Sequence, residues 1–382
     1  MIERNLSKEL LLLANEYPVV TILGPRQSGK TTLARSCFPT HRYVNLEEPE
    51  SRNLARTDPK AFFSLNPPPV VLDEVQRVPE LLSWIQVMVD ERSDKGAFVL
   101  TGSSQLALRA SIAQSLAGRN ASATLLPLTF SEMASAGIHP DRDTCILHGF
   151  FPRVHAERQD PVRAYRNYIQ DYIERDVRQL LNVRNMIAFE RFLGLLAGRV
   201  GQLVNLQSLA ADTGVSSTTL AEWLSVLEAS FVIYRLKPFF ENVGKRLVKS
   251  PKLYFSDVGL AASLLGLRTR ATVARDPLLG GLFENVVVME AVKQCLNRGE
   301  DPPLYFYRDQ NGREIDLILD RDRALVPIEI KASMTWTPEY SRAVRWFRAL
   351  SPRAVPGMVV YAGDRRIDGD GYSAVPFGEF TI

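Results

Sequence analysis

Short apolar runs separated by longer amphipathic segments characterise roughly the first 135 residues. The runs at 18–23, 70–72 and 98–101 are rich in Val, Ile and Leu and have the length of strands that are buried on both faces. Two further strands are expected at 43–46 and 123–126. Because helical segments separate these strands, the pattern predicts a parallel α/β sheet flanked by helices.

The middle of the chain has a mainly helical pattern. Residues 137–161 are rich in Gly, Pro and charge, which is typical of a domain boundary. After them we expect four helices and then two strands, at 165–181, 189–196, 206–212, 216–228, 231–236 and 252–255. A short helix, a tight turn, a second helix and a hairpin in this order indicate a winged-helix domain.

A second α/β pattern occupies the end of the chain. The expected elements are a helix, three strands, a helix and a last strand, at 282–296, 304–307, 314–319, 325–331, 338–350 and 357–361. The charged turn at 320–323 makes the second and third strands an antiparallel hairpin. The sequence thus predicts an α/β protein with three domains, at 1–135, 136–275 and 276–382.

A glycine-rich turn joins the first strand to a helix. It comprises Gly24, Pro25, Arg26, Gln27, Ser28, Gly29, Lys30 and Thr31, and Thr32 continues into the helix. Glycines let the backbone approach an anion with its N–H groups turned inward, and the helix N-terminus adds a positive dipole. Lys30 can then reach the β and γ phosphates of ATP, while the Thr31 hydroxyl can ligate Mg²⁺. A chance glycine-rich turn is the alternative, but the flanking strand and helix favour a P-loop NTPase.

Polar residues follow the next two apolar strands. Asp73 is expected to hold Mg²⁺ through water, and Glu74 to orient and deprotonate the attacking water. Without the loop upstream, a helix N-cap would be the favoured interpretation of this acidic pair. Ser103 or Ser104 follows the next strand and would lie beside the γ phosphate as a sensor, unless it belongs to an ordinary strand-to-helix turn.

Charged side chains converge in the last domain. Because side chains alternate along a strand, Glu329 and Lys331 share one face of theirs. Asp316 faces outward on the neighbouring strand, and Glu284 on the preceding helix can join it. Two carboxylates, an ammonium group and a third carboxylate are therefore expected to lie close together.

Charge is nearly balanced over the whole chain, with 46 Lys and Arg against 43 Asp and Glu. This balance gives no general preference for nucleic acid or an acidic membrane. Residues 161–275, however, hold sixteen Lys or Arg against nine Asp or Glu. The second helix of the winged-helix pattern exposes mainly Ser, Thr and Glu, which does not support sequence-specific DNA recognition. Non-specific nucleic-acid contact and a packing or oligomerisation module remain as the two interpretations of this domain.

Hydropathy gives no sign of a membrane segment, since no run approaches the roughly 20 apolar residues that a spanning helix needs. The apolar run at 10–14 is too short for a secretory signal. The three cysteines, Cys37, Cys145 and Cys295, are widely spaced, which argues against a disulfide framework. We therefore expect a cytoplasmic protein without a membrane partner.

Several motifs together resemble a known family. They are GPRQSGKTT at 24–32, LDEVQ at 72–76, TGSS at 101–104, SLAGR at 115–119, YIERD at 172–176 and SPKLY at 250–254. In this order they resemble the AAA-type prokaryotic ATPases that carry a C-terminal domain of unknown function, over most of the chain. The resemblance implies ATP and Mg²⁺ as cofactors and a homo-oligomer in which Arg119 completes a neighbouring subunit's site. A surface ion pair is the alternative role of Arg119.

The end of the chain resembles the restriction-endonuclease-like nuclease core. The residues that carry this resemblance are 312–316, Gly-Arg-Glu-Ile-Asp, and 329–331, Glu-Ile-Lys. It implies that Glu284, Asp316 and Glu329 bind Mg²⁺, and that Lys331 activates water or stabilises the charge developing on the phosphate. An ordinary ion pair on an exposed strand face is the alternative.

Two functions are consistent with these patterns. In the first, magnesium-dependent ATP hydrolysis is coupled to nucleic-acid binding or processing, with nuclease activity in the last domain. In the second, the chain is a nucleotide-dependent switch or assembly protein whose winged-helix and nuclease-like domains only bind partners.

Overall fold

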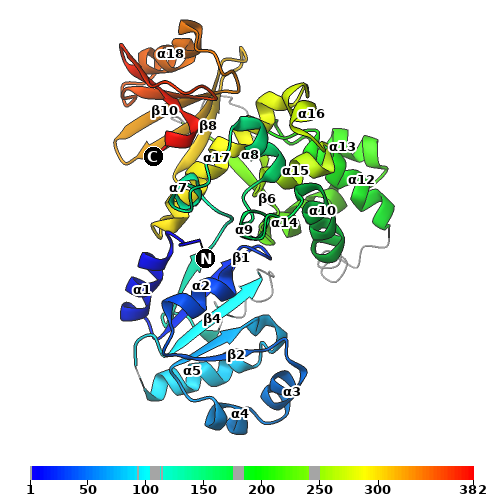
Figure 1. Ribbon diagram of the computed structural model, residues 1–382, viewed down its shortest axis with the longest axis vertical. Helices are drawn as coiled ribbons and strands as arrows, with labels where there is room; N and C mark the ends of the chain where they lie inside the picture. Colours follow the sequence, from blue (N-terminus) through cyan, green and yellow to red (C-terminus); the bar gives the residue numbers. More distant parts are fainter. Residues whose placement is uncertain (1, 93, 104–111, 113–114, 175–184, 241–249) are drawn as a thin grey trace. The chain divides into compact units, whose positions relative to one another are not determined.

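Two units make up the chain in the computed structural model (Figure 1), which describes residues 2–92, 94–103, 112, 115–174, 185–240 and 250–382. Unit 1 comprises Met1–Leu128, Ala229–Phe231 and Cys295–Glu300. Unit 2 comprises Thr129–Glu228, Val232–Gln294 and Asp301–Ile382.

Unit 1 contains a five-stranded sheet in the order β2-β3-β4-β1-β5, and all its neighbouring strands are parallel. The strands are β1 Val19–Gly24, β2 Arg42–Asn45, β3 Val70–Asp73, β4 Phe98–Ser103 and β5 Asn120–Thr124. The predicted parallel α/β sheet is thereby confirmed. Strand β5 begins three residues before its expected start, because Asn120 and Ser122 on this edge strand interrupt the apolar pattern.

Helices cover both faces of this sheet. Helices α1 (Ser7–Glu16) and α2 (Lys30–Cys37) pack on one face, where Leu10 and Leu33 meet Val20 and Val99. Helices α3 (Pro49–Thr57), α4 (Pro59–Leu65) and α5 (Leu81–Glu91) pack on the other face, and the short 3₁₀ helix η1 (Val75–Arg77) follows β3. The central strands are therefore buried on both sides, and only their ends are free for chemistry.

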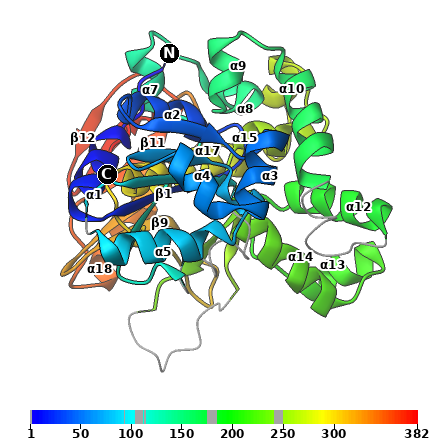
Figure 2. The ribbon, with the colours of Figure 1, turned by 90° about the horizontal axis from the view of Figure 1, so that it is seen from below.

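The first part of unit 2 is helical. Its helices are α7 Phe130–Ser135, α8 Arg142–His148, α9 Pro152–Ala156, α10 Pro161–Tyr168, the π-helix η2 Ile169–Glu174, α12 Met186–Ala197, α13 Leu206–Thr213 and α14 Ser217–Ala229. Helices α12, α13 and α14 lie together (Figures 1 and 2), and Phe189 and Phe192 of α12 contact the Trp223 ring of α14 at 5.3 and 5.5 Å between centroids. Of the helix expected at 165–181, the part beyond residue 174 lies outside the described residues.

The rest of unit 2 is built on an eight-stranded sheet in the order β12-β13-β11-β10-β9-β8-β6-β7. Its strands are β6 Ile233–Pro238, β7 Lys252–Phe255, β8 Leu304–Arg308, β9 Glu314–Arg321, β10 Ala324–Lys331, β11 Gly357–Tyr361, β12 Ile367–Gly369 and β13 Tyr372–Pro376. The remaining helices are α15 Val258–Leu264, α16 Arg270–Ala274, α17 Leu279–Asn297, η3 Pro338–Ser341, α18 Arg342–Leu350 and η4 Phe377–Glu379.

Two features of this sheet differ from expectation. The hairpin β6–β7 continues into the C-terminal strands, since β6 pairs with β8 through Lys237↔Tyr305 and Pro238↔Phe306. Strand β11 is not the last strand, because β12 and β13 follow it. Both of these are short, and β12 has no buried residue, so the hydrophobic pattern gives no signal for it.

No helix in the described part of the chain is long and apolar enough to cross a membrane.

Candidate functional site

The glycine-rich loop runs from the end of β1 to the start of α2, as the sequence predicts. Gly24 and Gly29 have φ values of 152° and 95°, in the region that favours glycine. A Cβ atom on Gly24 would lie 2.1 Å from the Leu125 carbonyl oxygen, so only glycine fits between the loop and the end of β5. The loop is therefore held in a tight turn whose conformation the glycines permit.

Lys30 lies inside this loop. Its side chain is buried, and its ammonium group donates hydrogen bonds to the carbonyl oxygens of Gly24 (3.0 Å) and Pro25 (2.8 Å). Burial lowers the pKa of Lys30 to about 8, against the attraction of the Glu74 carboxylate. The ammonium group thus bridges two carbonyl groups of the loop. A bound phosphate could replace these two carbonyl oxygens as the acceptors of its hydrogen bonds.

Thr31 and Asp73 form the part of the site that suits a metal ion. The Thr31 hydroxyl donates to Asp73 Oδ2 at 2.9 Å, and the Tyr43 hydroxyl donates to the same oxygen at 2.7 Å. Thr101 of β4 also donates to Asp73. Mg²⁺ binds hydroxyl and carboxylate oxygens, and here the Thr31 hydroxyl already contacts the Asp73 carboxylate. The residues present therefore fit Mg²⁺ beside the loop.

Glu74 follows Asp73 with a φ of 58°, a left-handed conformation that is uncommon for residues other than glycine. Its backbone N–H donates to Thr101 Oγ1 at 3.2 Å, and its carboxylate accepts a hydrogen bond from the Gln76 amide. Burial raises the pKa of the Glu74 carboxyl, while Lys30 and Arg26 oppose this shift. A half-buried carboxylate beside Lys30 and Asp73 is in the place where a base for water is needed.

Arg4 is a residue of this site that no motif indicates. Its guanidinium donates to the carbonyl oxygens of Ser28 in the loop and of Leu126 after β5, both at 2.6 Å. The Arg4 side chain is buried. Nearby, the buried Ser28 hydroxyl has no hydrogen-bond partner among the residues that the structure describes. Because the Ser28 carbonyl belongs to the phosphate loop itself, its hydrogen bond with Arg4 stabilises the position of the loop.

Two further predicted residues have different positions. Ser103 pairs in register with Gly24, so it ends β4 directly beside the loop, while Ser104 lies outside the described residues. Arg119 lies at the amino end of the sheet, where its carbonyl oxygen accepts a hydrogen bond from Val19. Its guanidinium binds Asp90 at 2.5 and 3.0 Å. Arg119 therefore lies away from the loop of its own chain and forms the ion pair that was its alternative role.

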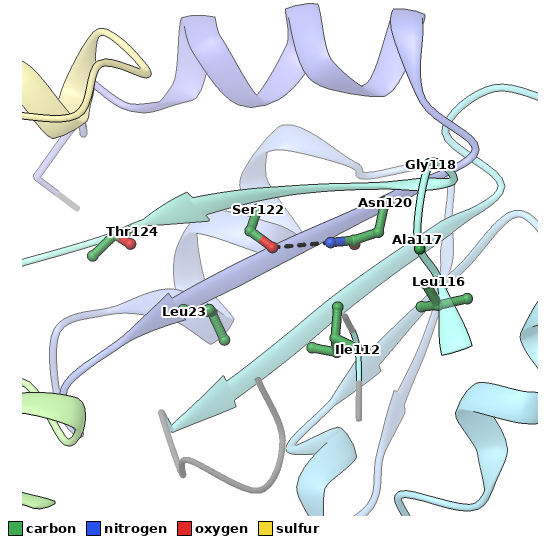
Figure 3. A pocket seen from close by; sticks show the side chains of 8 residues that line it. All are labelled: Leu23, Ile112, Leu116, Ala117, Gly118, Asn120, Ser122 and Thr124. Atoms are coloured by element: carbon green, nitrogen blue, oxygen red, sulfur yellow. Dashed lines mark hydrogen bonds between the residues drawn. The ribbon is translucent and has the colours of Figure 1, made fainter. Parts of the chain in front are cut away.

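A cavity of about 310 Å³ lies beside the edge strand β5 (Figure 3). It is lined by Leu23, Ile112, Leu116, Ala117, Gly118, Asn120, Ser122 and Thr124. The Asn120 amide donates to the Ser122 hydroxyl at 2.9 Å across its wall. None of the described residues that line it is an acid or a base, and its polar groups are the side chains of Asn120, Ser122 and Thr124.

A second cluster of charged residues lies in unit 2. Ligand oxygens of Glu284 (α17), Glu314 and Asp316 (both β9) lie within 4.8 Å of one another. Glu329 is not in this group; it pairs with Lys331, whose ammonium also lies 3.9 Å from Asp316. The structure thus places Glu284 and Asp316 in one group with Glu314, since residues 314 and 316 share one face of β9.

Lys252 of β7 points into this cluster. Its ammonium donates to Glu284 at 2.7 Å, forms an ion pair with Glu314 and lies 3.9 Å from Asp316. Burial disfavours the ammonium form, but the three carboxylates outweigh this effect and raise the pKa of Lys252. A cation of the chain itself therefore lies against Glu284 and Asp316, two of the three residues expected to bind the metal. With Lys252 in this place, the residues do not fit Mg²⁺.

Burial also changes the carboxyl groups of this cluster. Together with the charge of Asp316, it raises the pKa of Glu284 to about 7 and that of Glu329 to about 8. The Tyr254 hydroxyl donates to Glu284 at 2.5 Å. Sequence reasoning did not assign Lys252 a role, because only the fold brings β7 beside α17 and β9.

A parallel sheet with a strand, phosphate loop and helix, followed by an Asp-Glu pair at the end of β3, defines the class of AAA-type P-loop ATPases. Residues 16–134 match the model of an AAA domain. Residues 140–271 and 279–380 match two domains of unknown function, DUF8612 and DUF4143.

The chain belongs to the same family as an uncharacterized protein of Mycobacterium tuberculosis, Rv2008c. The two are 33% identical over 378 residues, which cover 98% of this chain and 83% of the mycobacterial protein. An uncharacterized protein of Methanocaldococcus jannaschii is 23% identical, with 84% of this chain and 76% of that protein covered. Among solved structures, a Walker-type ATPase of Pyrococcus abyssi is 16% identical and has a TM-score of 0.46, with 69% of this chain and 96% of that chain covered.

Proposed function

We propose that this protein binds ATP with Mg²⁺ and hydrolyses it. The observation that carries the proposal is the meeting of Lys30, Thr31 and Asp73 at the loop, with Glu74 next to Asp73. When bound, Mg²⁺ would be held by the Thr31 hydroxyl and, through water, by Asp73, and would neutralise charge on the β and γ phosphates. A cytoplasmic location accords with this cofactor pair.

The residues of the chain divide the work of hydrolysis. The loop N–H groups and the N-terminus of α2 bind phosphate oxygens, and Lys30 leaves the carbonyl oxygens of Gly24 and Pro25 to bind the β and γ phosphates. Glu74 orients the attacking water and accepts its proton. In an assembly of several copies, Arg119 is the candidate to reach a neighbour's γ phosphate, for which it would leave Asp90.

Two substitutions test this proposal. Lys30→Ala should abolish measurable ATP binding, because it removes the ammonium group that bonds across the loop turn. Glu74→Gln should leave ATP affinity within about twofold and lower turnover by roughly 10²–10⁴-fold, which is the usual contribution of a general base. Lys60→Ala and Glu80→Gln, at exposed positions of the same unit, are the matched controls. Turnover that is unchanged in Glu74→Gln would refute the role of Glu74.

We further propose that unit 2 has a nuclease-like core that binds nucleic acid without sequence specificity. The order α17, β8, β9, β10, α18, β11 supports the core, with β8–β9 and β9–β10 antiparallel and β10–β11 parallel. The order α12, α13, α14, β6, β7 and the basic excess of residues 161–275 support a winged-helix element as a phosphate-contacting surface. Because Lys252 fills the carboxylate cluster, metal-dependent cleavage is not part of this proposal.

The nucleic-acid proposal is tested by fluorescence anisotropy with labelled DNA and RNA of unrelated sequences. We expect similar affinities for all sequences and a loss of affinity with rising salt, with and without Mg²⁺-ATP. If no nucleic acid binds while ATP changes the oligomeric state, the protein is instead a nucleotide-dependent switch or assembly protein.

A further inference from the structure

The ammonium group of Lys252 is built into the carboxylate cluster of unit 2. The Lys252 side chain is only 3% exposed and lies over the Phe306 ring, 5.6 Å from its centroid. It bonds Glu284 at 2.7 Å, pairs with Glu314 and lies 3.9 Å from Asp316. These are the three residues whose oxygens could share one metal ion.

The backbone at Lys252 is paired on both sides, which fixes the point from which its side chain reaches the cluster. On one side, β7 pairs with β6 through Leu236↔Lys252. On the other side, Leu203 forms a bridge with Lys252, and Leu253 exchanges backbone hydrogen bonds with Gly201 and Gln202 (2.8 and 3.0 Å). The strand that carries Lys252 is therefore fixed along both edges. A change of the Lys252 rotamer alone would withdraw the ammonium group from three half-buried carboxylates.

A divalent metal and this ammonium group compete for the same oxygens. Mg²⁺ binds oxygen ligands at about 2.1 Å in octahedral geometry and keeps several waters. The cluster already has its positive charge at hydrogen-bond distance, in a position closed to solvent. A metal ion entering it would have to displace Lys252 and bury the ammonium without a partner, which is costly.

We propose that Lys252 is an internal cation that takes the place of a divalent metal in this cluster. The wild-type core then holds Glu284, Glu314 and Asp316 without metal, and removing the Lys252 charge creates a divalent-cation site. The inference does not depend on ATP hydrolysis, because every residue in it belongs to unit 2.

The test measures Mn²⁺ binding to the whole chain without nucleotide. Binding is monitored as the decrease in the electron paramagnetic resonance signal of free Mn²⁺. Lys252→Met removes the charge at similar length, Lys252→Arg keeps it, and Asp316→Asn is made in the wild-type and Lys252→Met backgrounds. We expect one additional Mn²⁺ per chain in Lys252→Met, lost or at least tenfold weaker when Asp316→Asn is added. The wild type should bind no Mn²⁺ that Asp316→Asn removes, and Lys252→Arg should bind the same number of Mn²⁺ ions per chain as the wild type. Any binding near Asp73 is common to all variants and cancels in this comparison.

Two results would overturn the proposal. One is a Mn²⁺ site in the wild type that Asp316→Asn abolishes, and the other is a folded Lys252→Met that gains no site. If Lys252→Met folds only with Mn²⁺, as judged by circular dichroism, the proposal is supported. If it does not fold at all, the comparison of wild type with Asp316→Asn decides: equal Mn²⁺ binding supports the proposal and unequal binding overturns it.

Discussion

Lys30 is buried in the loop before any nucleotide is bound, and this has a consequence for pH dependence. Its pKa of about 8 in the free protein means that the ammonium form, which binds phosphate, is lost as the pH rises through 8. Bound phosphates favour the ammonium form and raise this pKa. We therefore predict that ATP binding at pH 9 takes up close to one proton, and that affinity falls by up to about tenfold per pH unit above 8.

Calorimetric titration in two buffers of different ionisation enthalpy measures this proton uptake. At pH 7 Lys30 is already protonated, so little uptake through this residue is expected there. The Lys60→Ala variant should behave like the wild type. An ATP affinity that is constant from pH 7 to pH 9.5 would show that Lys30 keeps its proton in the free loop.

The residues of the two charged clusters differ in how far the sequence could predict them. Lys30 and Thr31 are adjacent in a motif whose strand and helix context can be seen in the sequence, and Asp73 and Glu74 end an unmistakable buried strand. Arg4 belongs to no motif, and Lys252 lies in the SPKLY motif, which by itself indicates no partner for its side chain. Their roles arise because the fold places them beside carbonyl or carboxylate groups that are 24 or more residues away in the chain.

At the scale of elements, the segment before α1 is tied to the phosphate loop through Arg4. Arg4→Ala would leave the carbonyl oxygens of Ser28 and Leu126 without this donor inside the protein. Because hydrogen bonds to a charged group contribute about 1.5–3 kcal/mol each, we predict a loss of roughly 3 kcal/mol in the free energy of unfolding of unit 1. ATP affinity should fall with it, since the loop loses its support.

Denaturant unfolding and ATP titration measure the two effects of Arg4→Ala. Arg4→Lys keeps the charge but cannot donate to both carbonyl oxygens in the same geometry, so it should lie between the alanine variant and the wild type. Arg119→Ala removes an exposed ion pair of the same unit and should leave stability close to that of the wild type. Unchanged ATP affinity in a folded Arg4→Ala would contradict the role of this residue in the loop.

The elements that the sequence predicts well are those buried on both faces. Strands β1, β3 and β4 are continuous apolar runs and lie where the pattern places them. The pattern places β5 three residues too late and gives no signal for the short strands β12 and β13. All three lie at or near the edge of a sheet, where fewer positions need apolar residues. The pairing of β6 with β8 joins residues that are 68 positions apart, and no local pattern encodes such a pairing.

At the scale of the whole molecule, each unit has its own sheet and its own buried core. The sheet of unit 2 includes β6 and β7 as well as the C-terminal strands, so the helical part and the C-terminal part share one structure. A cut between them, near residue 275, would expose the edge of β8 and remove Lys252 from Glu284. These two parts should therefore unfold together.

We accordingly predict two cooperative unfolding transitions for the full chain, one for each unit. Mg²⁺-ATP at 100 times its dissociation constant should stabilise one of them by about 2.7 kcal/mol and leave the other unchanged, because a ligand stabilises only the unit that binds it. Lys30→Ala should abolish this shift. Lys252→Met should lower the other transition by roughly 3–5 kcal/mol, since it removes a buried ammonium group from beside three half-buried carboxylates. Scanning calorimetry with and without nucleotide distinguishes these cases. A third transition, in which part of unit 2 unfolds separately, would contradict the prediction that its shared sheet unfolds as one.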